Sequence, residues 1–61
     1  MNMSTEKLFE FAKNNNIVIK ELNGIYSIII PLTVTDEQLS GLKEVIPKEL
    51  KTVLVFKETN G

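Results

Sequence analysis

The chain has 61 residues and a formal net charge of −1, with seven lysines against eight acidic residues and no arginine, histidine or cysteine. Without histidine and cysteine it can form no disulfide or thiolate metal site, and it lacks the commonest zinc ligand and general base. A near-neutral chain without arginine also lacks the basic surface typical of nucleic-acid-binding proteins, so nucleic acid is not expected as a partner.

Residues 1–61 are predicted to form one small α+β domain. A domain of this size buries only about 60% of the surface that its unfolded chain exposes, so its stability is marginal without further support. With no disulfide or metal available, that support is expected from self-association or from a partner. No leader pattern and no run of ~20 apolar residues is found, which predicts a cytoplasmic protein with no membrane partner.

The first predicted element is an amphipathic helix at about residues 4–14. Ser4 is its candidate N-cap, and the face expected to be buried carries Leu8, Phe11 and Ala12. Phe9 lies beside that face, where an aromatic side chain is either the edge of the core or an exposed anchor for a partner. The asparagine run at 14–16 supplies residues that tolerate the left-handed conformation at a helix end.

Two strands, at about 17–22 and 25–31, are predicted to form a hairpin. Asn23-Gly24 between two β-branched runs favours a type I′ turn, which needs positive φ at both central residues. This turn sets Leu22 opposite Ile25, and the alternation of side chains then separates two faces. The face predicted to join the core carries Ile17, Ile19, Tyr26, Ile28 and Ile30 with Glu21. The other face is also largely apolar, with Val18, Leu22, Ile25 and Ile29 beside Lys20 and Ser27.

A second helix is predicted at about residues 36–46. Thr35 and Gln38 stand at capping-box spacing, and Pro47 ends the helix. Gly41 inside this helix costs about 1 kcal/mol relative to alanine. Either a strand or a partner approaches closely at this position, or the helix simply tolerates the glycine.

The last predicted element is a strand at about 51–57, which completes the order α-β-β-α-β around a small three-stranded sheet. A right-handed crossover should return this strand parallel to the second one. Placement beside the first strand, in the order 2-1-3, is preferred, and placement beside the second strand is the alternative. Both helices are expected mainly on one face of the sheet, because two short helices cover about one three-stranded face.

This arrangement leaves an apolar sheet face without cover, which soluble monomers seldom do. A homodimer that buries this face or a sheet edge is therefore predicted. In the alternative, one helix packs on each face and closes a monomeric core. The candidate residues for self-association or for a partner interface are Val18, Leu22, Ile25, Ile29, Tyr26 and Phe56.

Catalytic, cofactor and metal-binding residues are not predicted. Glu21 opposite Tyr26 is the one polar pair on the core face, and a buried carboxyl there could act as a general acid or base. A solvated cross-strand contact beside the turn is the favoured interpretation. The glycines fit no phosphate-binding loop pattern, so the chain is predicted not to be an enzyme.

The function predicted by exclusion is a non-enzymatic protein-binding module that acts as a homodimer. The chain is rich in Lys, Asn, Ile and Glu, a composition that indicates an AT-rich genome. Together with its small size, this composition predicts a phage or mobile-element accessory protein that inhibits or modulates an unknown host protein. The alternative is a regulatory module that binds nucleic acid weakly through scattered lysines. These are Lys7, Lys13, Lys20, Lys48, Lys51 and Lys57.

Overall fold

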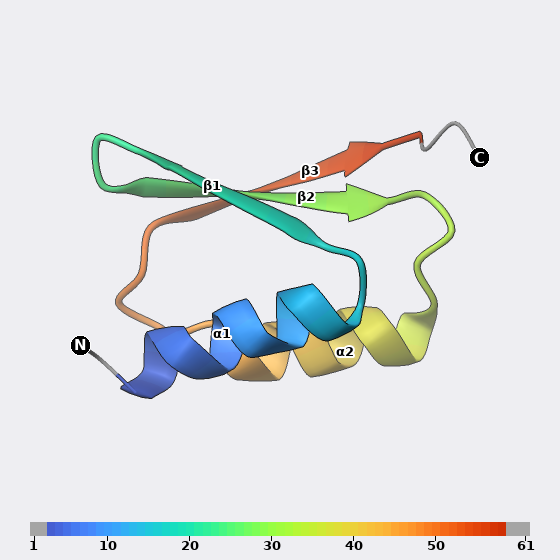
Figure 1. Ribbon diagram of the computed structural model, residues 1–61, viewed down its shortest axis with the longest axis horizontal. Helices are drawn as coiled ribbons and strands as arrows, with labels where there is room; N and C mark the ends of the chain where they lie inside the picture. Colours follow the sequence, from blue (N-terminus) through green and yellow to red (C-terminus); the bar gives the residue numbers. More distant parts are fainter. Residues whose placement is uncertain (1–2, 59–61) are drawn as a thin grey trace.

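The computed structural model describes residues 3–58, and their side chains from residue 5 onward. Two helices and a mixed three-stranded sheet form a small α+β fold, which confirms the predicted class and element order (Figure 1). The elements are α1 (Met3–Asn14), β1 (Val18–Leu22), β2 (Ile25–Pro31), α2 (Asp36–Val45) and β3 (Thr52–Lys57). Each boundary lies within one residue of its predicted position. The proposed cap at Ser4 lies outside the side chains that the structure describes.

The β1–β2 hairpin forms in the predicted register. Asn23 and Gly24 have φ values of 54° and 82°, as a type I′ turn requires. Leu22 pairs with Ile25 across the turn, and the strands remain antiparallel as far as Val18 and Ile29. The register therefore follows from the turn residues and from the apolar alternation together.

The preferred strand order 2-1-3 is wrong, because the sheet has the order β1-β2-β3. β3 runs parallel to β2, from Tyr26 opposite Thr52 to Pro31 opposite Lys57. The physical reason lies in the composition of the strands. The central strand is paired and packed on both sides, and β2 supplies Ile28 and Ile30, which are fully buried. β1 carries adjacent charged residues in the sequence VIKEL, which an edge strand tolerates better than a central one.

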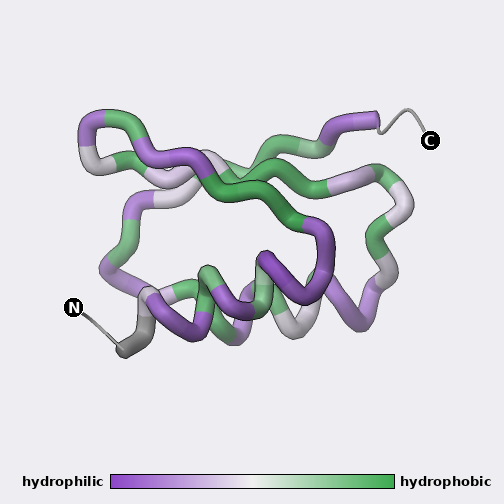
Figure 2. Tube along the Cα trace, viewed as in Figure 1, coloured by the Kyte–Doolittle hydropathy of each residue, from purple (hydrophilic) through white to green (hydrophobic). Residues whose placement is uncertain are grey.

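The hydrophobic core lies between one face of the sheet and the two helices. Both helices lie on the same side of the sheet (Figure 1). The core residues are Leu8, Ala12, Ile17, Ile28, Ile30 and Leu42. Figure 2 shows that hydrophobic residues run along the strands, whereas both helices alternate between hydrophilic and hydrophobic residues. Each helix thus contributes one apolar stripe, and the fold has one helical layer and one sheet layer.

The ends of the two helices are joined by a small polar network. Asn16 has φ of 58°, and the Ile17 amide donates to the Ala12 carbonyl at 2.9 Å, which ends α1 as in a Schellman motif. Asn15 donates from Nδ2 to the Phe11 carbonyl and accepts from Gln38 Nε2 at 3.1 Å. Gln38 therefore links the start of α2 to the end of α1.

The capping box at α2 is formed as predicted. The Gln38 amide donates to Thr35 Oγ1 at 3.1 Å, and the Thr35 amide donates to Gln38 Oε1 at 2.9 Å. We expect Thr35→Ala to lower the free energy of unfolding by about 1 kcal/mol. Urea denaturation measures this loss, with Thr33→Ala at an exposed position outside the helix as the control. Equal stability of the two variants would show that the cap contributes nothing.

Gly41 permits close contact between the two helices. A Cβ at this position would lie 2.9 Å from Cε2 and 3.0 Å from Cζ of Phe11 on α1. The close approach considered from the sequence therefore exists, but it comes from α1 and not from a strand. Simple tolerance of the glycine is also wrong, because the Phe11 ring occupies the space that a methyl group would need.

We expect Gly41→Ala to show no stabilisation in the parent chain, because displacement of the Phe11 ring offsets the gain in helix propensity of about 1 kcal/mol. In a Phe11→Leu background the same substitution should stabilise the chain by close to that amount. Denaturant unfolding of the two single variants and the double variant gives the coupling energy between the positions. If the effects of Gly41→Ala and Phe11→Leu on the free energy of unfolding simply add, close packing between Gly41 and Phe11 would be contradicted.

Candidate functional site: the uncovered sheet face and the β3 edge

The sheet face that points away from both helices is apolar and exposed. We call it the open face, and its apolar residues are Val18, Leu22, Ile25, Ile29, Val53 and Val55. Leu22 is 73% exposed, and Val18 and Val53 are each 50% exposed. Within the described residues both helices lie on the other side, so the alternative of one helix on each face is wrong. The described residues leave five of these side chains exposed, and Ile29 is partly buried.

The six candidate interface residues fall on two different faces. Val18, Leu22, Ile25 and Ile29 lie together on the open face. Tyr26 is half-buried on the helix side, where its ring lies 6.1 Å from that of Phe9, centroid to centroid. Phe56 is also on the helix side, level with Ile30, but it is 50% exposed. Only the first four therefore form a single surface.

The sequence-based candidate set misses Val53, Leu54 and Val55. Val53 and Val55 extend the open face onto β3, opposite Ser27 and Ile29. Their face depends on the register between two parallel strands that are joined through a helix, and no turn residue determines that register. The one signal available in the sequence is the unbroken apolar run of β3, which shows that both of its faces are apolar.

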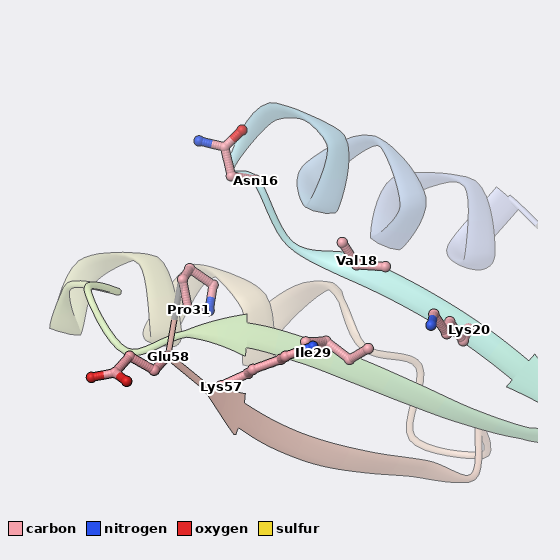
Figure 3. A pocket seen from close by; sticks show the side chains of 7 residues that line it. All are labelled: Asn16, Val18, Lys20, Ile29, Pro31, Lys57 and Glu58. Carbon is pink, nitrogen blue, oxygen red and sulfur yellow. The ribbon is translucent and has the colours of Figure 1, made fainter. Parts of the chain in front are cut away.

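A shallow groove of about 450 Å³ lies at one end of the open face (Figure 3). Val18, Ile29 and Pro31 supply its apolar surface, and Lys20 on β1 and Lys57 on β3 line it from the two outer strands. Asn16 and Glu58 complete the lining. The groove thus combines apolar contact area with two cationic side chains and one carboxylate.

The Glu21–Tyr26 pair has a structural role in the hairpin. The two residues are cross-strand partners, and the Gly24 amide donates to Glu21 Oε2 at 2.8 Å. Glu21 is exposed, so its carboxylate supports the turn from a solvated position. The favoured interpretation of a contact beside the turn agrees with this geometry.

Charged side chains are dispersed over the described part of the chain. Within residues 3–58, no three Asp or Glu side chains are grouped so that they could hold a metal ion. The lysines considered for nucleic-acid binding lie on different elements. Lys7 and Lys13 are on α1, Lys20 and Lys57 are on the sheet, and Lys48 and Lys51 lie between α2 and β3. The fold does not bring these six side chains together.

The outer edge of β3 presents unpaired backbone groups. The Lys51 carbonyl accepts from the Tyr26 amide in β2, and the Lys57 carbonyl accepts from the Leu32 amide just after β2. In a parallel ladder, alternate residues of a strand bond to the same neighbouring strand. Odd-numbered residues of β3 therefore bond to β2. The N–H and C=O groups of Thr52, Leu54 and Phe56 point to the free edge, where no described strand pairs with them.

Neither described helix has the length and apolar character needed to cross a membrane. Comparison with family models, curated proteins and solved structures gives no match for this chain. Within the described residues, the open face and the free β3 edge are the two surfaces suited to contact with another protein.

Proposed function

We propose that the chain is a non-enzymatic protein-binding module that acts as a homodimer and binds a target protein through its open face. The observation that carries this proposal is an apolar sheet face that spans all three strands, with five exposed side chains and the partly buried Ile29. The exposed side chains are Val18, Leu22, Ile25, Val53 and Val55. Contiguous apolar surface of this kind is costly in water and is typical of a surface that another protein covers. A role as a phage or mobile-element inhibitor of a host protein stays a prediction from composition.

The lining of the groove favours a protein that combines apolar and acidic groups. Val18, Ile29 and Pro31 offer apolar contact, and Lys20 and Lys57 offer charge-assisted hydrogen bonds to carboxylates at its margin. Interfaces with an apolar centre and a polar rim have this composition. The open face is therefore proposed to hold the apolar side of the target, with acidic residues at its rim.

The test uses the immobilised chain to capture proteins from bacterial lysates. The parent is compared with Val18→Glu/Val53→Lys, which places two charges on the open face, and with Glu10→Lys on exposed α1 as the matched surface control. We expect a protein that the parent and the control retain and that the open-face variant retains at least about tenfold less, since each 1.4 kcal/mol lost is a factor of ten.

Two outcomes would contradict the proposal. Equal retention of the same proteins by the parent and the open-face variant would show that the open face is not the binding surface. Retention of DNA or RNA that falls steeply with added salt would instead support the nucleic-acid alternative.

A further inference from the structure

The outer edge of β3 has the composition of a strand that pairs with another chain. Between Lys51 and Lys57 the sequence is TVLVF, with no charge, proline or glycine, and every residue from Val53 to Lys57 is exposed. Natural proteins usually protect a free edge with charged side chains, proline or a bulge. The first five residues of β3 carry none of these protections, and its one charged residue is Lys57 at the C-terminal end.

The opposite edge of the sheet, along β1, is protected. β1, the other outer strand of the sheet, carries Lys20 and Glu21 in its middle. Charges of this kind oppose pairing with a further strand. The two edges therefore differ, and β3 is the edge available for pairing.

We propose that a second copy of the chain pairs with β3 through its own β3, antiparallel and about a two-fold axis, to give a continuous six-stranded sheet. The unpaired backbone groups of Thr52, Leu54 and Phe56 are spaced two residues apart, as an antiparallel partner strand requires. Because the same strand is used twice, the interface is closed and self-complementary.

The charges at the ends of β3 select the register. A pairing centred on Leu54 sets Lys51 directly opposite Lys57 of the second copy, and it does so at both ends. Like charges directly opposite each other destabilise a strand pair. A shift that centres the pairing on Val55 removes this repulsion and sets Leu54 opposite Phe56 and Thr52 opposite Glu58 of the second copy. The second register is therefore preferred, with Val55 opposite Val55 of the second copy in a non-hydrogen-bonded pair.

This dimer places the two open faces on the same side of one sheet, because the two-fold axis is perpendicular to the sheet. The surface proposed above to bind a target is then doubled and continuous across the interface. The edge pairing deepens the homodimer of the proposed function by naming the strand and the register, and the doubled surface rests on the proposed target binding.

Single cysteines test the register directly, because the chain contains no cysteine of its own. In the preferred register the Cα atoms of the two Val55 residues are about 4.5 Å apart, which suits a disulfide. The two Val53 residues are about 13 Å apart, because they are displaced by four residues along the strands. We expect Val55→Cys to form disulfide-linked dimers under mild oxidation at least about tenfold faster than Val53→Cys. Ser40→Cys, on exposed α2, gives the rate of random collision, and circular dichroism confirms that each variant is folded.

Three results would overturn the inference. Cross-linking of Val55→Cys no faster than that of Ser40→Cys would exclude the edge pairing. Equally fast cross-linking of Val53→Cys and Val55→Cys would indicate contact between sheet faces. Fast linkage only in a mixture of Val53→Cys with Val55→Cys would replace the preferred register with the one centred on Leu54. The lysate capture is a separate readout, so loss of the edge dimer with retained capture would leave target binding intact.

Discussion

Replacing Ile28 with alanine is expected to remove a large part of the chain's free energy of unfolding. Ile28 lies in the central strand with no exposed surface and belongs to the core shared with Leu8 and Leu42. Truncating a buried isoleucine to alanine lowers the free energy of unfolding by about 2–5 kcal/mol. A 61-residue chain has a total stability of only about 3–9 kcal/mol. Thermal and urea denaturation followed by circular dichroism measure the loss.

Ile29→Ala is the matched control, because the same residue type one position later faces the opposite side of the sheet. Ile29 lies on the open face and is only partly buried, so its truncation should cost less than about 1 kcal/mol. A loss as large as that of Ile28→Ala would show that another layer, such as a second copy, covers the open face. The pair of variants therefore also distinguishes edge pairing from face packing.

Proline substitutions in β3 are expected to separate folding from association. The Val55 amide points to β2, so Val55→Pro removes a ladder hydrogen bond inside the sheet and should unfold the chain, at a cost of about 3 kcal/mol or more. The Leu54 amide points to the free edge, where proline is tolerated. Leu54→Pro should therefore remain folded, at the cost of some packing.

Leu54→Pro should weaken association even though the chain stays folded. Leu54→Pro removes an interchain hydrogen bond from each copy and leaves its acceptor unpaired, which we expect to weaken the dimer about 100-fold. Circular dichroism reports on the fold, and sedimentation velocity reports on association. Unfolding of both variants to the same extent would contradict the assigned alternation of backbone groups. Undiminished association of folded Leu54→Pro would exclude the β3 edge as the interface.

The hairpin and both helices could be predicted because local chemistry determines them. Asn23-Gly24 sets the turn and hence the register of the hairpin, and the Thr35 capping box sets the start of α2. Four of the six candidate interface residues share the open face because the same alternation places them there. These are short-range properties of the chain, and a single sequence contains them in full.

The strand order and the β3 part of the site could not be predicted in the same way. The position of β3 depends on which strand is central. β2 is central because Ile28 and Ile30 are buried under the helices while the strand pairs with β3 in parallel. The face of Val53 and Val55 depends on the same long-range register. Gly41 illustrates the point again, because its contact with Phe11 joins two helices that are distant in the sequence.

The solution mass of the parent chain, measured by sedimentation equilibrium over a wide concentration range, tests the central claim most directly. A chain with an unprotected β3 edge and an uncovered apolar face should behave as a dimer, with twice the monomer mass of 6.9 kDa. This dimer should dissociate only at the lowest concentrations. A mass of 6.9 kDa at every concentration would contradict the homodimer and would leave the open face as a surface for a different protein alone.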